Sequence, residues 1–186
     1  MKVLIIGMLG AGKSSLAFDL SRKYNLRRLN LDEICRSPQT GEYFPQETQI
    51  AETERFAKEY RNWVMEGCQK YLYERVSPDL VINMKISRLR AVWRFTTRFF
   101  KAKKLLDRYG PGVIRGREDE PVQPYHYRKP TLRKILEWDR ANREIESEIE
   151  SFLRQKGIKA VEVKSFKDYK KVYEILDKDK TCKKSA

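Results

Sequence analysis

The chain has 186 residues, of which 40% are hydrophobic and 35% charged, with a formal net charge of +14 and three cysteines. This length is enough for one domain with a well-filled core, and no apolar run is long enough to span a membrane, so we expect no membrane partner. The separated cysteines exclude a disulfide framework and a metal-binding knuckle, and the first predicted strand begins at residue 2, so we expect a cytoplasmic protein without a signal peptide.

The first predicted element, residues 2–6, is a short, apolar, β-branched run typical of a buried strand. Residues 7–14 then match G-x-x-x-x-G-K-[ST], the phosphate-binding P-loop or Walker A motif. Residues 15–23 have helical spacing, and Asn25 is expected to end this helix. The glycines permit a tight turn close to phosphate oxygens, Lys13 supplies a mobile cation, and the Ser14 hydroxyl can ligate Mg²⁺. The motif therefore predicts a nucleoside triphosphate site formed by Gly7, Leu9, Gly10, Ala11, Gly12, Lys13, Ser14 and Ser15.

Two carboxylates follow predicted strands, at the edge where open α/β sheets bind ligands. Asp32 follows the strand 26–31 and is placed to face the phosphates; the alternative is a helix N-cap or first-turn acid. A helix is expected over 48–60, and the strand 63–67 follows it and contains Glu66 near its end. Glu66 is a candidate Mg²⁺ ligand; the alternative interpretation is a solvated residue at the strand end. A short helix over 69–76 and a strand over 80–84 follow, and Asp79, before that strand, is interpreted as structural.

The predicted helix 88–106 carries the densest charge of the chain. Residues 85–108 hold nine Lys and Arg against one Asp, which indicates one anionic site or one docking face. One face of the helix is apolar, and another carries a stripe of basic residues. This stripe is interpreted as an anion-binding face; the alternative interpretation is an ordinary solvated face. Arg94 and Arg98 lie one turn apart and can grip phosphate oxygens together. The apolar face contains Val92, Phe95, Phe99 and Leu106, and the stripe contains Arg90, Arg94, Arg98, Lys101 and Lys104.

Residues 109–130 show no clear periodicity, and two arginines beside glycines suit either a lid over phosphates or a plain surface loop. His126, within this stretch, is interpreted as a packing or surface residue. A helix is expected over 131–155, with Thr131 as N-cap, Gly157 as stop, and Leu136 and Trp138 in the core. A strand over 158–163, a helix over 166–176 and a charged, frayed tail over 177–186 complete the chain.

Five short motifs follow one another along the chain: the P-loop, Leu31-Asp32, Trp63-Val64-Met65-Glu66-Gly67, Arg94-x-x-x-Arg98 and Val163-Lys164-Ser165. In their order and spacing they resemble those of small P-loop kinases of the adenylate-kinase type. The closest resemblance within that group is to the proteins named for DNA topology modulation, and it extends over nearly the whole chain. Two departures stand out: Glu66 replaces the usual Asp, and Gly67-Cys68-Gln69 replaces the common Gly-Asn-Tyr.

The resemblance implies an α/β fold, a P-loop NTPase three-layer sandwich around a five-stranded parallel sheet in the order 2-3-1-4-5. Residues 1–186 would form one kinase domain, with an acceptor-binding segment at 32–60 and a lid at 101–130. The resemblance further implies that Arg94 and Arg98 bind phosphates at the reaction centre. The Lys164-Ser165 turn would lie near the adenine of ATP.

The leading functional hypothesis is a phosphotransferase that uses ATP and Mg²⁺ to phosphorylate a small acceptor, a nucleoside monophosphate or a nucleoside. Lys13, Arg94 and Arg98 would neutralise charge on the transferred group, Ser14 and Glu66 would position Mg²⁺, and Asp32 would orient the acceptor or take its proton. The alternative is an ATP-binding, nucleic-acid-associated protein with weak or no kinase activity, which would bind nucleic acid through the basic helix 88–104.

Overall fold

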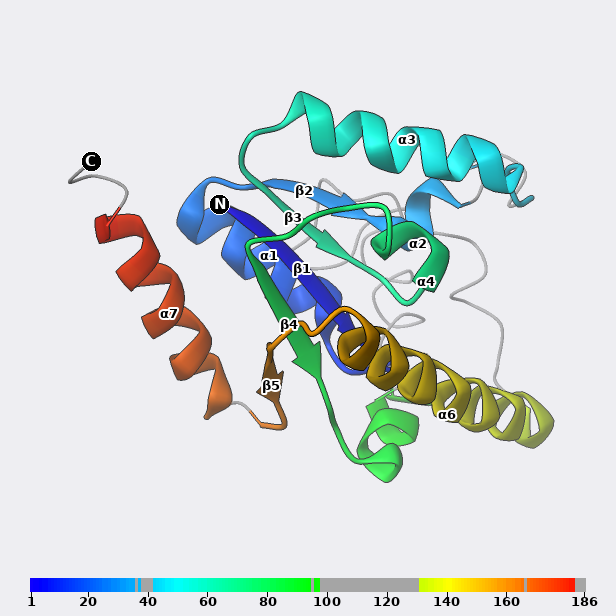
Figure 1. Ribbon diagram of the computed structural model, residues 1–186. Helices are drawn as coiled ribbons and strands as arrows, with labels where there is room; N and C mark the ends of the chain where they lie inside the picture. Colours follow the sequence, from blue (N-terminus) through cyan, green and yellow to red (C-terminus); the bar gives the residue numbers. More distant parts are fainter. Residues whose placement is uncertain (36, 38–41, 95, 98–130, 166, 183–186) are drawn as a thin grey trace, which may run out of the picture.

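The computed structural model describes residues 1–35, 37, 42–94, 96–97, 131–165 and 167–182. Its centre is a parallel five-stranded sheet in the order β2-β3-β1-β4-β5 (Figure 1). This order and the α/β class confirm the expectation from the sequence. The strands are β1 (Lys2–Gly7), β2 (Arg27–Asn30), β3 (Trp63–Glu66), β4 (Leu80–Met84) and β5 (Ala160–Val163).

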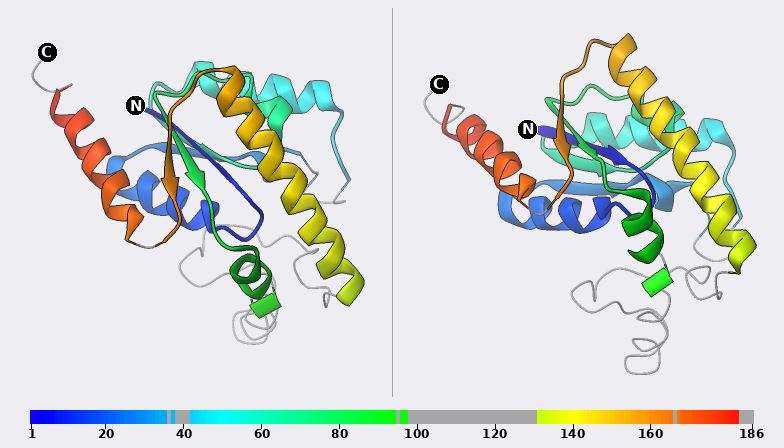
Figure 2. Two further views of the ribbon diagram at one scale, coloured as in Figure 1. Left: turned by 60° about the horizontal axis from the view of Figure 1, so that its bottom comes forward. Right: turned by 90° about the horizontal axis from the view of Figure 1, so that it is seen from below.

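Helices connect the strands and cover both faces of the sheet (Figure 2). α1 and α7 pack on one face, and α3, α4 and α6 pack on the other. Residues 88–94 and 96–97, within the predicted helix 88–106, are also helical. The labelled helices are α1 (Lys13–Tyr24), α2 (Leu31–Ile34), α3 (Gln46–Glu59), α4 (Lys70–Tyr73), α6 (Leu132–Gln155) and α7 (Asp168–Cys182).

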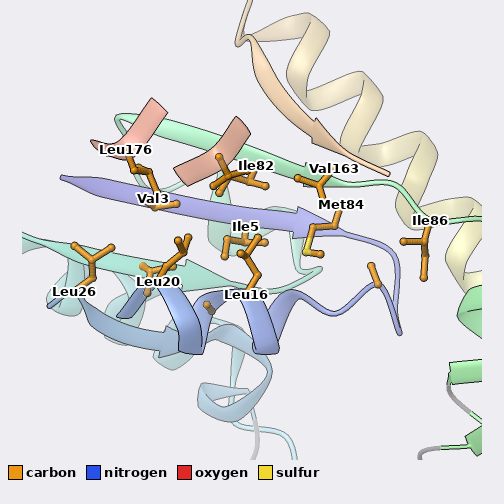
Figure 3. Close-up of a cluster of buried hydrophobic side chains, with 14 of the residues drawn as sticks. Val3, Ile5, Leu16, Leu20, Leu26, Ile82, Met84, Ile86, Val163 and Leu176 are labelled. Atoms are coloured by element: carbon orange, nitrogen blue, oxygen red, sulfur yellow. The ribbon is translucent and has the colours of Figure 1, made fainter. Parts of the chain in front are cut away.

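The central strand β1 is apolar from Val3 to Ile6, as expected of a strand that is buried on both faces. Successive side chains of a strand point to opposite faces, so Val3 and Ile5 join one core while Leu4 and Ile6 join the other. Figure 3 shows the first core, in which Leu16 from α1 lies beside Ile5. The strand therefore anchors the loop that follows it to the middle of the molecule.

Parallel strands bring all their carboxyl ends to one edge of the sheet. Glu66 at the end of β3 is in register with Ile5 of β1 and Asn30 of β2. Gly7 at the end of β1 is in register with Met84 of β4. The residues predicted to bind phosphate and metal consequently converge on this edge, as expected for an open α/β sheet.

Several predicted helix ends are confirmed. Asn25, with a φ of 53°, ends α1 in the left-handed conformation that asparagine tolerates. The Thr131 hydroxyl accepts a hydrogen bond from the Lys134 amide and caps α6, and Gly157 follows that helix. Asp79 accepts a hydrogen bond from the Lys2 amide at 2.8 Å, in agreement with its structural interpretation.

Three details differ from expectation. The helix predicted over 69–76 is the single turn α4, and helix α7 continues through residues 177–182, which were expected to fray. This extension is held by Asp177, which accepts a hydrogen bond from the Tyr24 hydroxyl at 2.7 Å and pairs with Lys23 at 3.3 Å. Leu136 is 62% exposed instead of buried, because it lies two residues, or about 200° of helix rotation, from Trp138 on the packed face.

The predicted lid 101–130, Arg98, Lys101, Lys104 and His126 lie outside the described residues. The same holds for Phe95, Phe99 and Leu106 of the expected apolar face. Within the described ranges, no helix combines the length and the apolar character needed to cross a bilayer.

Candidate functional site

The loop after β1 leads directly into the start of α1. Gly7 has a φ of +146°, and a Cβ at this position would lie 2.5 Å from the Met84 carbonyl oxygen, so only glycine fits against β4. The loop closes with a hydrogen bond from the Ala11 amide to the Met8 carbonyl at 3.2 Å. α1 then begins at Lys13 without a side-chain cap and without an acidic residue in its first turn. Its first amides and the positive end of its dipole therefore favour an anion at this position.

Helix α6 holds the outer side of this loop. Asn142, which is 1% exposed, accepts a hydrogen bond from the Leu9 amide at 2.8 Å. One turn earlier, the Trp138 ring lies against Gly10, where a Cβ would be 3.3 Å from the ring. The sequence interpretation missed Asn142; the available signal was a polar residue within the apolar face of an amphipathic helix.

Lys13 is buried at the centre of the site, with 6% of its surface exposed. Its ammonium donates to the carbonyls of Gly7 and Met8 and to the sulfur of Cys68, each at 3.1 Å. Burial acts to lower the pKa of Lys13, but its interactions with Cys68, Glu66 and Asp32 raise it above its usual range. The lysine therefore stays charged although it is buried.

Glu66 is a buried acid, 1% exposed, so its interpretation as a solvated strand-end residue is wrong. Burial raises the pKa of Glu66, while Lys13, a hydrogen bond with Ser14 and the guanidinium of Arg28 oppose this rise. Arg28 Nη2 lies 3.6 Å from Glu66 Oε1, and Oε1 has no hydrogen-bond partner among the described residues. A buried carboxylate oxygen in this state is available to an additional ligand.

The donors Ser14 and Glu66 suit Mg²⁺, which prefers hard oxygen ligands and keeps several waters or phosphate oxygens. Within the described ranges, no three His, Cys, Asp or Glu side chains cluster as a metal site. The protein donors thus fit a cation that also contacts phosphate and water, and they do not form a complete cage.

Asp32 lies in the first turn of α2, so the alternative interpretation of this residue as a first-turn acid is correct. The Asn30 side chain caps the helix by accepting from the Asp32 amide at 2.9 Å. The Asp32 carboxylate also faces the loop: it raises the pKa of Lys13 and accepts a hydrogen bond from Gln69 Nε2. The interpretation as a first-turn acid is therefore confirmed, and the placement of Asp32 facing phosphates stays a prediction. Gln69 is a contact that the sequence did not indicate.

Arg94 reaches the loop from the helical residues 88–94. Its Nη1 donates to the Ala11 carbonyl at 3.0 Å and would lie 3.5 Å from a Cβ on Gly12. Another arginine of this helix, Arg88, forms a bidentate ion pair with Asp139. Its Nε donates to Oδ1 at 2.8 Å and its Nη2 to Oδ2 at 2.6 Å. Of the two described members of the basic stripe, Arg94 is therefore engaged with the loop, whereas the side chain of Arg90 is exposed.

The Lys164-Ser165 turn caps α7. The amides of Lys164 and Ser165 and the Ser165 hydroxyl donate to one oxygen of Asp168, at 3.0, 2.8 and 3.0 Å. The same helix places the Tyr169 hydroxyl 3.8 Å from the position of a Cβ on Gly12, so the start of α7 adjoins the loop. The structure thus gives the turn a capping role and brings its helix next to the loop.

Comparison with known proteins gives no match: neither a protein-family description nor a curated protein is similar to this chain.

Proposed function

We propose that the chain is a phosphotransferase that moves the γ-phosphoryl group of ATP to a small acceptor, such as a nucleoside monophosphate or a nucleoside. The observation that supports this most is the buried, charged Lys13 at the uncapped start of α1. A polyphosphate complements both the ammonium and the free helix amides. On this basis we infer that residues 7–14 are a P-loop.

In this proposal, Lys13 exchanges its carbonyl and sulfur partners for the outer phosphate oxygens. The loop amides bind the same phosphates, and Arg94, beside Ala11, neutralises charge that develops on the transferred group. Arg98 would act with Arg94, as the sequence predicts. Asp32 orients the acceptor or takes its proton.

Ser14 and Glu66 would hold Mg²⁺, which would supply positive charge to offset the charge of the phosphates. The adenine would lie near Lys164 and Ser165, a placement supported by the contact between the start of α7 and the loop. We assign the reaction to the reducing cytoplasm because Cys35 and Cys68 are free thiols.

The test is transfer of label from γ-labelled Mg·ATP to a panel of nucleosides, nucleoside monophosphates and small hydroxylated compounds, with products separated by ion exchange. We expect label on an acceptor and loss of turnover in Lys13→Ala. The matched control is Lys159→Ala, an exposed lysine just before β5, at the opposite edge of the sheet. Far-UV circular dichroism verifies that both variants are folded. Full activity in Lys13→Ala would show that the proposed mechanism is wrong.

The second hypothesis, an ATP-binding nucleic-acid-associated protein, gains no support from the described part of helix 88–97. Of the two described members of the basic stripe, Arg94 is bonded to the loop and Arg90 is exposed, and a single exposed arginine does not make a nucleic-acid-binding surface. We therefore propose only the phosphotransferase.

A further inference from the structure

Arg28 and Glu66 lie on the same face of the sheet. Parallel pairing sets Arg28 of β2 opposite Val64 of β3, and Asn30 opposite Glu66. Because every second side chain of a strand points to the same face, the Arg28 and Glu66 side chains share the face of Val64. Val64 belongs to the core that packs against α1. Both charged side chains therefore lie on the side of the sheet that α1 covers.

The Arg28 guanidinium is a counter-charge of the Glu66 carboxylate. The two side chains are 15% and 1% exposed, and Arg28 Nη2 lies 3.6 Å from Glu66 Oε1. This distance is longer than a hydrogen bond, and Oε1 accepts no hydrogen bond from any residue that the structure describes. The charge of the carboxylate is therefore compensated, while the lone pairs of Oε1 remain open to a further ligand.

Lys13 is also near Glu66, but it is not a fixed counter-charge. Its ammonium donates to two loop carbonyls and to the sulfur of Cys68, each at 3.1 Å. In the proposed function this ammonium moves to the phosphate oxygens, whereas Arg28 belongs to a strand of the sheet. A buried carboxylate that loses its cation is strongly destabilised. Arg28 is thus the cation that stays beside Glu66 when nucleotide is bound.

We propose that Arg28 is the positioning residue of Glu66, and that it holds this carboxylate in the place where it ligates Mg²⁺ together with Ser14. The inference rests on the proposed function, which brings Mg·ATP to the site. Arg28 acts through Glu66 and does not ligate the metal, because a guanidinium has no acceptor lone pair. Residues that orient a metal ligand in this way contribute about 10- to 100-fold to metal affinity.

The decisive experiment measures metal binding directly, with Mn²⁺ as the probe. Mn²⁺ is titrated into the protein complex with the β,γ-imido analogue of ATP, with protein in excess over nucleotide, and free Mn²⁺ is read by electron paramagnetic resonance. Arg28→Met keeps a long unbranched side chain and removes the charge. We expect it to lower the Mn²⁺ affinity at least about tenfold. Unchanged affinity, or absence of Mn²⁺ binding to the unsubstituted complex, would overturn the proposal.

Two variants separate positioning from a general loss of charge or of stability. Arg27→Met is the matched control, because Arg27 precedes Arg28 on β2 but is exposed and lies over the Tyr60 ring, 5.3 Å from its centroid. We expect less than a twofold change in its Mn²⁺ affinity. Arg28→Lys keeps the charge and should recover part of the affinity that Arg28→Met loses. Equal losses in Arg27→Met and Arg28→Met would overturn the assignment of Arg28.

A double variant tests whether Arg28 acts through Glu66. Glu66→Gln removes the charged ligand, so adding Arg28→Met should lower the Mn²⁺ affinity no further. This double variant also contains no unpaired buried carboxylate, so it remains informative if Arg28→Met alone does not fold. Additive losses would show that Arg28 acts on another group and would overturn the positioning role.

The kinetic readout distinguishes this proposal from the phosphotransferase itself. In Arg28→Met we expect the KM for Mg²⁺ to rise about tenfold, with the KM for ATP at saturating Mg²⁺ changed less than about threefold. Phosphoryl transfer with an unchanged Mn²⁺ affinity in Arg28→Met would overturn only the role of Arg28. Loss of Mn²⁺ affinity in this variant, without transfer to any acceptor by the unsubstituted protein, would overturn only the phosphotransferase and support the role of Arg28.

Discussion

Gly7→Ala is expected to destabilise the protein because of one close approach between two strands. The Cβ of the alanine would lie 2.5 Å from the Met84 carbonyl oxygen and 3.0 Å from the Met84 Cβ. Both atoms belong to the buried end of β4, which is paired with β1 and cannot move without disturbing the sheet. The backbone angle adds to this clash, because a φ of +146° is unfavourable for alanine.

The magnitude follows from the two terms. A residue held in a glycine-only backbone region costs about 1–3 kcal/mol, and overpacking a core costs about 1–3 kcal/mol. Their sum is centred near about 4 kcal/mol, a large part of the about 5–15 kcal/mol that stabilises a typical domain. The effect does not depend on any ligand, so it tests the geometry of the loop independently of the proposed reaction.

Gly157→Ala is the matched control for this substitution. Gly157 also has a positive φ, +61°, but nothing lies within 4 Å of the position of its Cβ. Its cost is the backbone term alone, about 1–2 kcal/mol. The assay is equilibrium urea unfolding followed by far-UV circular dichroism, with equal m-values as the criterion for comparison. If Gly7→Ala costs no more than Gly157→Ala, the close approach of β4 is not the reason for glycine at position 7.

Three further substitutions test other contacts. Asn142→Leu leaves the partly buried Leu9 amide without its acceptor and should cost about 1 kcal/mol in urea unfolding. Tyr24→Phe removes the hydrogen bond to Asp177 and should cost about 1 kcal/mol by the same measurement. Hydrogen bonds from the amides of the Lys164-Ser165 turn lower the pKa of Asp168, so its stabilisation is present above the ordinary Asp pKa and is lost as the pH falls through the lowered value. Asp168→Asn should therefore lower the Tm at pH 7. In thermal melts near pH 2, the Tm of the variant and the Tm of the unsubstituted protein should become equal.

Each of these expectations has an outcome that contradicts it. An Asn142→Leu protein as stable as the original would show that α6 does not hold the loop through this bond. Tyr173→Phe is the control for Tyr24, because the two rings stack and the Tyr173 hydroxyl makes no hydrogen bond within the described residues. Equal costs at both positions would exclude a specific contribution from Asp177. A Tm difference for Asp168→Asn that persists at low pH would show that the charge of Asp168 is not stabilising.

The positions of the candidate site residues could be predicted only in part. Asp32 and Glu66 were expected at strand ends, but the sequence left each with two interpretations. Glu66 is buried because β2 supplies Arg28 and α1 supplies Ser14, and both come from distant parts of the chain. Leu136 was wrongly expected in the core. Leu136 and Trp138 lie on different sides of α6, and the sequence pattern alone does not indicate which side packs against the sheet.

By itself, the sequence determined the features that depend on neighbouring residues. The order of strand, glycine-rich loop and helix at residues 2–24, the left-handed stop at Asn25 and the Thr131 cap are local, because backbone preference and short-range hydrogen bonds specify them. The strand order, expected from a family resemblance carried by short motifs, is also observed.

Only the tertiary structure decided which side chains meet. Cys68 contacts Lys13 across 55 positions of the chain, Gln69 contacts Asp32 across 37, and Asn142 contacts Leu9 across 133. No local pattern specifies such pairs, because they arise when parallel strands bring their ends to one edge and α6 packs beside the loop. The charge of Lys13 and the orientation of Asp32 depend on these long-range contacts. The chemistry that the site can perform therefore depends on them as well.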